Sequence, residues 1–341
     1  MEFGSARFSE RSEVLDLLAL WYDDRSFFAR YNENDRAFRD ELCLVARNNG
    51  RIVSTVQIFD RRVRLMGHEV AMGGIGSVYT LKDCRQRGIA SELMKLSLQI
   101  MEREAFEVSL LFAERLKFYS GFGWESVQRQ FTAISSADSI RAESTVELLG
   151  FQAERDLEEV SRVHESYSGR FDGTVVRDRD YWMGNLAYAG NPSEIFMVAR
   201  DHSRIEGYGR AVTFHQIPML MEYGYLPGCE KSALAIFRHF GTMVRDQPSH
   251  FAFDPEHRNE AQKPSNAGIL LSHTVHDSAL EAQLKDADAH LYQHPDNYYM
   301  WRVINSRKMA ERLRCAEAEA GKRMMDAVKA TDSLYWTADR F

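Results

Sequence analysis

The residues best suited to chemistry lie in one short stretch, Arg85-Gln86-Arg87-Gly88-Ile89-Ala90. The first amides of a helix have no partner within the helix, and the helix dipole adds partial positive charge there. A phosphate or pyrophosphate is the natural ligand of such a helix start. Gly88 lets the backbone come close to a ligand, and Arg85 and Arg87 add formal positive charge. This stretch therefore predicts an anion-binding turn.

The neighbouring segments have the patterns that would hold this turn in place. A β-rich segment ends at Thr80, and helix formers run from about Gly88 to Arg103. Apolar residues recur along that helix at positions 89, 93, 96 and 100, so one face belongs to the core. We expect a strand, an exposed turn and a helix with a buried stripe.

The rest of the chain predicts an α/β (α+β) fold with mixed sheets. A helix is expected at 11–22, and Asn48-Asn49-Gly50 between two β-rich runs is typical of a hairpin. Short strands and helices then alternate to about residue 130. The second half repeats this order of elements, and the end of the chain is charged and helical. A polar, apolar-poor stretch at 135–145 suggests a boundary between two domains.

Composition narrows the class of protein. The 341 residues carry a net charge of −7, which argues against nucleic acid as a partner and mildly favours a cationic substrate. No apolar run approaches the ~20 residues of a membrane span, so no membrane partner is expected. Four widely spaced cysteines favour the cytoplasm over a disulfide framework. The opening Glu-Phe-Gly-Ser resembles a cloning remnant, and we base no fold prediction on it.

The turn resembles the acetyl-CoA signature of the GCN5-related N-acetyltransferases (GNAT), R/Q-x-x-G-x-G/A between a strand and a helix. Arg85, Gly88 and Ala90 occupy the three signature positions. The resemblance implies acetyl-CoA as cosubstrate, bound by the preceding strand and the turn. The cofactor-binding residues that it implies are Val78, Tyr79, Thr80, Arg85, Gln86, Arg87, Gly88, Ile89, Ala90 and Ser91. The alternative is a turn whose arginines only face solvent.

A second resemblance lies in Phe118–Trp124, the sequence FYSGFGW. It is similar to the F-Y-x-x-x-G-[FWY] segment of the same family, whose tyrosine lies beside the coenzyme A thiol. The resemblance implies that Tyr119 is catalytic. A phenol there would protonate the thiolate as an amine displaces it. The alternative is a hydrogen-bonded tyrosine of the core.

Two such halves followed by a tail resemble the Eis (enhanced intracellular survival) family. The resemblance implies a catalytic domain at 1–137, a second domain at 145–295 and a shortened, sterol-carrier-like helical segment at 296–341. The second domain lacks the signature, so we expect it to bind no coenzyme A. In this family the terminal carboxylate acts as general base, which implies that role for Phe341; a frayed terminus is the alternative. Family members assemble as hexamers, so a homo-oligomer is also expected.

The acceptor would face the first helix and the loop after it. Trp21, Asp23, Asp24, Phe27 and Phe28 combine aromatic rings with carboxylates, which suits the ammonium group of a primary amine. The alternative is a solvated acidic turn with core aromatics. The sequence does not name the amine.

Other chemistry has weaker support. His273 and His276 have ligand-like spacing but no third ligand, so we expect no metal. Cys84 is expected to be a loop thiol and not a nucleophile. Two further functions stay open: a non-catalytic acyl-CoA-binding or assembly module, and an enzyme using another acyl group or an acyl-CoA decarboxylation.

Overall fold

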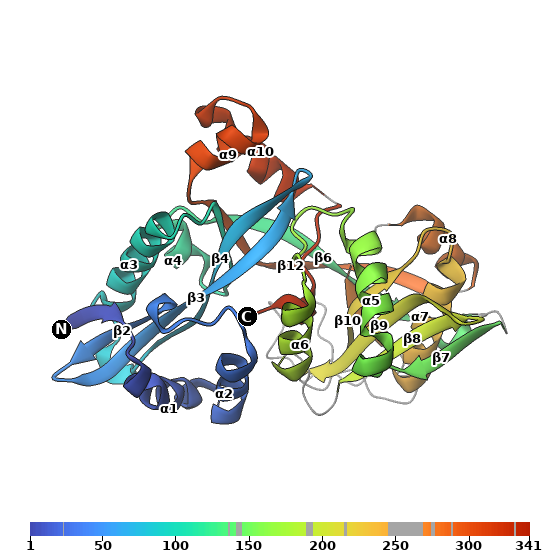
Figure 1. Cartoon of the computed structure of the whole chain (residues 1–341), viewed down its shortest axis with the longest axis horizontal. Helices are drawn as coiled ribbons and strands as arrows, with labels where there is room; N and C mark the ends of the chain where they lie inside the picture. Colours follow the sequence, from blue (N-terminus) through green and yellow to red (C-terminus); the bar gives the residue numbers. More distant parts are fainter. Residues whose placement is uncertain are drawn as a thin grey trace.

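The chain folds into two lobes that share one sheet. The computed structural model describes residues 1–22, 24–135, 137–140, 145–188, 194–214, 217–244, 269–273, 277–287, 289–330 and 332–341. Helices cover both lobes, and the C-terminus lies between them (Figure 1). The alternation of strands and helices along both halves agrees with the prediction of a mixed α/β fold.

The elements of the first lobe come in the predicted order from α1 (Arg11–Tyr22) onward, except that helix α2 (Arg25–Asn34) forms where the sequence predicted a loop. They are β1 (Glu2–Ser5), η1 (Phe8–Glu10), α1 (Arg11–Tyr22), α2 (Arg25–Asn34), η2 (Asp40–Leu42), β2 (Cys43–Asn48), β3 (Arg51–Leu65), β4 (His68–Thr80), η3 (Lys82–Cys84), α3 (Ile89–Arg103), β5 (Val108–Phe112), α4 (Leu116–Ser120), β6 (Glu125–Ser135) and η4 (Ala137–Ser139). The hairpin between β2 and β3 turns at Asn49 and Gly50, whose φ angles are 51° and 79°. Asparagine and glycine tolerate this left-handed backbone better than other residues do, so the turn forms where the sequence predicts it.

The second lobe and the end of the chain hold the remaining elements. They are β7 (Val146–Gly150), α5 (Ala153–Ser168), α6 (Arg179–Tyr188), β8 (Ile195–Asp201), β9 (Arg204–Phe214), β10 (Ile217–Tyr225), α7 (Glu230–Val244), β11 (Ile269–His273), α8 (Ser278–Asp286), β12 (His290–Val303), α9 (Ser306–Leu313), α10 (Glu317–Lys329) and η6 (Thr337–Asp339).

The N-terminal residues are part of the fold, although their sequence resembles a cloning remnant. Strand β1 pairs antiparallel with β2, from Glu2 opposite Arg47 to Ser5 opposite Leu44. The side chain of Arg47 also donates to the Ser5 carbonyl at 2.9 Å. Main-chain pairing at a sheet edge needs no particular side chains, so the composition of this segment did not reveal it.

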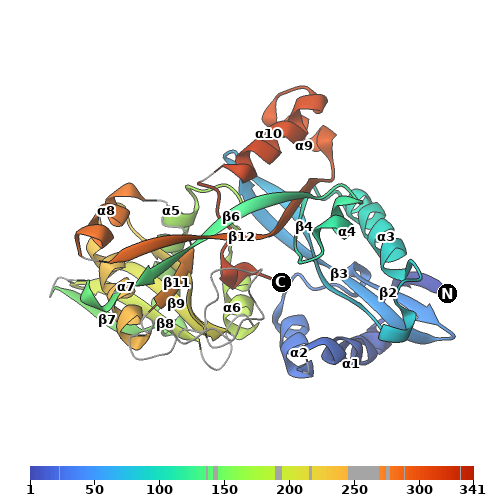
Figure 2. The same ribbon diagram turned by 180° about the vertical axis from the view of Figure 1, so that it is seen from behind.

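The two lobes exchange strands with each other. The described strands form a sheet in the order β1-β2-β3-β4-β5-β12-β6-β11-β10-β9-β8-β7. In the first lobe β12 lies between β5 and β6, and in the second lobe β6 lies between β11 and β12. The two long strands cross from one lobe to the other in Figure 2. The predicted boundary at 295/296 falls within β12, and the domain division stays a prediction.

Helices cover both faces of the sheet in each lobe, because successive side chains of a strand point to opposite faces. In β2, Cys43 and Val45 pack with α1, whereas Leu44 and Ala46 pack with α3. In the second lobe α5 packs on one face of β8 and β9, and α7 packs on the other. Helices α9 and α10 cover the far end of the β3–β4 hairpin. In the described part of the chain, no helix has both the length and the apolarity to cross a membrane.

Candidate active site

The predicted anion-binding turn lies at the start of α3, and its backbone is open to a ligand. Gly88 caps the helix with a φ of 76°, and a Cβ atom there would meet nothing within 4 Å. The first intrahelical bond runs from the Glu92 amide to the Gly88 carbonyl, at 3.1 Å. The amides of residues 89–91 are therefore the partnerless ones of the first turn, and no side chain caps them.

The three residues before Gly88 are exposed. The Nε of Arg85 donates to the Thr80 carbonyl at 3.0 Å, and its guanidinium lies 5.5 Å from the ring centre of Tyr79. These contacts fix the side chain of Arg85 beside the end of β4. Gln86 has a φ of 63° and Gly88 a φ of 76°, so two residues of the turn have left-handed backbone before the helix begins. The site thus combines helix amides with positive side chains.

Strand β4 has an edge that leads into this turn. Its parallel pairing with β5 ends where Ile75 lies opposite Leu111. Directly after this, Ser77 and Val78 both lie opposite Val56 of β3, and Ser77 has a φ of 50°. This β-bulge turns β4 away from β5. The segment 76–80 still pairs with β3, but no described strand pairs with its other edge, which can accept an extended ligand.

The side chains of β4 itself mostly support the fold. The ring of Tyr79 is buried in the core cluster that also holds Phe28. The hydroxyl of Ser54 donates to the Tyr79 carbonyl at 2.9 Å and lies 2.7 Å from the Thr80 hydroxyl. The backbone of residues 78–80 is therefore what remains for a cofactor, as the resemblance implies.

Tyr119 lies on α4 and packs against the core cluster of Ile75 and Leu111. Burial raises the pKa of its phenol to about 12, and Arg115 opposes this only weakly. The hydroxyl therefore keeps its proton at neutral pH, which is the form that a general acid needs. The carbonyl of Tyr119 accepts the Phe122 amide at 2.9 Å, so the α4–β6 turn holds the residue in place.

Phe341 packs against β4 just before the bulge. A Cβ atom at Gly74 would lie 2.6 Å from its Cε1, and one at Gly76 would lie 3.3 Å from its backbone oxygen. Its ring stacks on Phe59 at 4.9 Å and lies 5.3 Å from the ring of Phe112. The end of the chain therefore enters the first lobe beside the unpaired edge of β4.

The sequence did not predict a group of buried side chains that packs beside Phe341. The ring of Tyr31 lies edge-on to Phe59 at 5.2 Å. The buried guanidinium of Arg61 donates to Asp35 at 2.7 Å and to the Tyr31 hydroxyl at 3.1 Å. Arg61 also lies over the ring of Tyr181 from the second lobe, 5.4 Å away. These contacts join α2 and its C-cap to β3 and α6, and no local pattern in the sequence indicates them.

The predicted acceptor residues separate into different roles. Phe28 is buried in the core, and the carboxylate of Asp24 caps α2 by accepting the Phe27 amide at 3.0 Å. Hydrogen bonds from the Ser26 hydroxyl and the Phe27 amide lower the pKa of Asp24. Trp21 and Phe27 are 50% and 41% exposed, so they are available to a ligand at this surface. Asp23 lies outside the described residues.

The matching place in the second lobe is filled with buried charge. Strand β10 has its own bulge at Met221, directly after its parallel pairing with β11 ends. The carboxylate of the next residue, Glu222, accepts hydrogen bonds from both terminal nitrogens of Arg177, at 2.8 and 2.9 Å. Burial would raise the pKa of Glu222, but Arg177 above all holds it well below its usual range. Helix α7 starts with Glu230, which disfavours a phosphate there.

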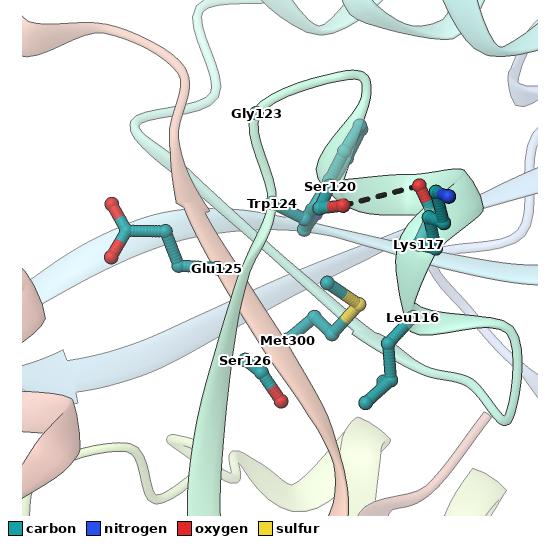
Figure 3. Close-up of a pocket in the computed structure, with 8 residues that line it drawn as sticks. All are labelled: Leu116, Lys117, Ser120, Gly123, Trp124, Glu125, Ser126 and Met300. Carbon is teal, nitrogen blue, oxygen red and sulfur yellow. Dashed lines mark hydrogen bonds between the residues drawn. The ribbon is translucent and has the colours of Figure 1, made fainter.

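An open hollow of about 570 Å³ lies on another side of α4. Its lining residues are Leu116, Lys117, Ser120, Gly123, Trp124, Glu125, Ser126 and Met300 (Figure 3). None of them is a predicted site residue. Among the described residues no cluster of His, Cys, Asp and Glu could hold a metal; His273 contacts Thr337, and His276 lies outside those residues.

The part of the chain that forms most of this site matches the model of a known protein family. Residues 4–127 match the family model described as an acetyltransferase (GNAT) domain. The chain is similar in structure to a GCN5-related N-acetyltransferase from Anabaena variabilis, with a TM-score of 0.68 and 15% identity over 91% of this chain and 74% of that one. A search of curated proteins gives no match.

Two further solved structures share the arrangement of both lobes. Eis1 from Mycobacterium abscessus has a TM-score of 0.62 at 13% identity, over 91% of this chain and 75% of that one. Saccharomyces cerevisiae N-myristoyltransferase with bound myristoyl-CoA has a TM-score of 0.56 at 12% identity, over 89% and 78%. At these identities the likeness establishes the fold.

Proposed function

Because residues 4–127 form a GNAT acetyltransferase domain, we propose that this chain transfers the acetyl group of acetyl-CoA to a primary amine of a small cationic substrate. One observation carries the proposal. The open helix start at Gly88 follows the unpaired edge of β4, and Tyr119 and Phe341 pack around the same strand. An acyl-CoA laid along that edge has its pyrophosphate at the turn and its thioester near the bulge.

The cofactor is held mainly by backbone groups. The amides and carbonyls of residues 78–80 pair with the pantetheine arm in the manner of an added strand. The amides of Ile89, Ala90 and Ser91 point at the pyrophosphate, and Arg85, Gln86 and Arg87 surround it. Gly88 is needed because its φ of 76° is strained for other residues.

The reaction is a direct attack of the amine on the thioester carbon. The amine loses a proton, a C–N bond forms, the C–S bond breaks, and the thiolate takes up a proton. Tyr119 supplies this last proton, since the high pKa of its phenol keeps it protonated. The carboxylate of Phe341 accepts the proton of the amine, directly or through a water.

The acceptor binds on the side of α1 and α2. The exposed rings of Trp21 and Phe27 provide surfaces for an ammonium group, and Asp23 and Asp24 add negative charge. The overall charge of −7 raises the local concentration of a cation. The second lobe binds no coenzyme A, because it lacks the signature and its helix α7 begins with the acidic Glu230.

Incubation of the chain with acetyl-CoA and a panel of amines tests this function. The panel should contain polyamines, aminoglycosides, amino acids and lysine peptides, with products identified by mass spectrometry. We expect one class to gain a single acetyl group per reactive amine. An acyl-CoA that binds but is never consumed would favour a binding module, and consumption without an acylated amine would favour another acyl-CoA chemistry.

A further inference from the structure

Several of the last residues of the chain are bound by the second lobe. The Leu334 amide donates to the Asp172 carbonyl at 2.7 Å, and the Trp336 indole donates to the Ser168 hydroxyl at 2.9 Å. The amide of Thr337 donates to His273 at 2.9 Å. We call residues 332–341 the tail segment. Figure 2 shows its C-terminal end emerging between the lobes.

The strongest of these contacts is an ion cluster around Arg177. Its guanidinium donates to both oxygens of Asp339, at 2.9 and 2.8 Å, and to both oxygens of Glu222. The side chains of all three residues are fully buried. The Tyr181 hydroxyl also donates to Asp339, at 2.9 Å. A buried charge is stable only with its partners, so removing either side of this contact leaves the other unpaired.

Asp339 precedes Phe341 by only two residues, which span at most ~7 Å of chain. The residue between them is also fixed, because Arg340 donates to Asp296 and to the Tyr299 hydroxyl, both at 2.9 Å. The contacts that Asp339 and Arg340 make with their partners thus help to set the position of Phe341 against Gly74 and Gly76 in the first lobe.

The cluster lies at the β10 bulge, the place in the second lobe that corresponds to the cofactor edge of the first. Since buried charge occupies it, this place is not available for a cofactor. We infer that the second lobe has a different purpose: its Arg177–Glu222–Asp339 cluster holds the tail segment so that Phe341 stays in the acyl-transfer site. Arg177 and Asp339 are positioning residues, and the inference rests on the proposed function of that site.

The test compares Asp339→Asn with Asp156→Asn. Asp156 is a matched control, since it is fully buried in the second lobe and pairs with Arg155 and Arg200 without touching the tail segment. Hydrogen exchange is followed in peptides covering 332–341 and, as an internal standard in the first lobe, 89–103. We expect Asp339→Asn to speed exchange in the tail peptide about tenfold to a hundredfold, the range for losing a charged hydrogen bond. Asp156→Asn should leave that peptide unchanged.

Kinetics separate positioning from general destabilisation. In Asp339→Asn the kcat should fall at least tenfold while the KM for acetyl-CoA stays within twofold, because the cofactor turn lies in the first lobe. Asp156→Asn should retain its kcat. Arg177→Lys, which keeps one charged partner for Asp339, should lie between Asp339→Asn and the wild type in both readouts.

The outcomes distinguish the two proposals. If no amine is acetylated by the wild type, the proposed function fails, yet the exchange experiment still tests the anchor. A double substitution then tests the link to the site: Gly74→Ala displaces Phe341, so its effect on tail exchange should add little to that of Asp339→Asn. Unchanged tail exchange in Asp339→Asn, fully additive exchange effects, or faster exchange with normal kcat would each overturn the inference.

Discussion

The ring of Phe341 occupies the space beside Gly74 that a Cβ atom at position 74 would need. A residue from the end of the chain is thereby fitted to a glycine in the middle of a buried strand of the other lobe. Gly76 completes the fit, since a Cβ there would lie 2.8 Å from Phe59, on which Phe341 stacks. Gly74 and Gly76 are thus required by the packing of Phe341 and Phe59 and not by a turn.

Gly74→Ala is expected to expel Phe341 from this position. The added methyl group overpacks the core and should lower the free energy of unfolding by about 1–3 kcal/mol. Turnover should fall by about a hundredfold, the cost of a ~1 Å misplacement of a reacting group. Urea unfolding and steady-state kinetics measure the two effects. Gly150→Ala is the control, because a Cβ there meets nothing within 4 Å; equal behaviour of the two variants would refute the fit.

Arg85→Ala combined with Gly88→Glu should weaken acetyl-CoA binding about a hundredfold or more, since a charged hydrogen bond is lost and a carboxylate replaces the open space. The fold should persist, because both positions are exposed. Calorimetric titration measures the affinity. Arg103→Ala, at the opposite end of α3, is the matched control and should bind normally. Unchanged affinity in the double variant would remove the turn from the cofactor site.

Tyr119→Phe is expected to lower kcat by ~10²–10⁴-fold, the usual contribution of a general acid, while acetyl-CoA still binds. Burial raises the pKa of Tyr119 to about 12, so its protonated form persists across the neutral and mildly alkaline range. Loss of kcat with a midpoint well below pH 12 would therefore belong to another group. Tyr292→Phe, at an exposed tyrosine of β12, should be neutral. Full activity of Tyr119→Phe would show that the thiolate leaves without this acid.

Glu10 should stabilise the N-terminal segment in a pH-dependent way. The hydrogen bond from Arg47 above all lowers the pKa of Glu10 from 4.5 to about 2. Its contribution is therefore complete above about pH 4.5 and is lost as the pH falls toward 2. Glu10→Gln should cost ~1 kcal/mol at pH 7, after allowance for solvent screening.

Urea unfolding at several pH values measures this difference, which should vanish near pH 2. The matched control is Glu2→Gln, because Glu2 is 64% exposed and lies 3.6 Å or more from Arg47 and Arg7. A Glu10→Gln variant whose deficit did not change with pH would contradict the assigned ion pair.

Local structure could be predicted from the sequence because it depends on neighbouring residues. The turn at Asn49 and Gly50, the end of β4 at Thr80 and helix α3 at Ile89–Arg103 all lie where the sequence predicts them. Each follows from backbone preference or apolar spacing within about fifteen residues. The start of α1 is an exception: Ser12 is a typical helix-capping residue, but η1 leads directly into α1 and the Ser12 hydroxyl accepts a hydrogen bond from Arg25.

The long-range arrangement could not be predicted in the same way. The sequence did not predict strand β12, and nothing local states that it inserts between β5 and β6. The aromatic contacts of Phe341 join residues nearly 300 positions apart, and the β4 bulge has no signal in the sequence of Ser77 and Val78. Which strands pair and which distant side chains meet depends on the packing of the whole chain. The catalytic roles of Tyr119 and Phe341 stay predictions.

Acylation of an amine by acetyl-CoA at the site around β4 can be measured in one assay. The most direct measurement is the release of free thiol from acetyl-CoA by the purified chain, with and without each amine of the panel, in parallel with the Tyr119→Phe variant. We expect thiol release that depends on a cationic primary amine, saturates with it, and is lost in Tyr119→Phe. Thiol release that no amine accelerates, or that Tyr119→Phe retains in full, would contradict it.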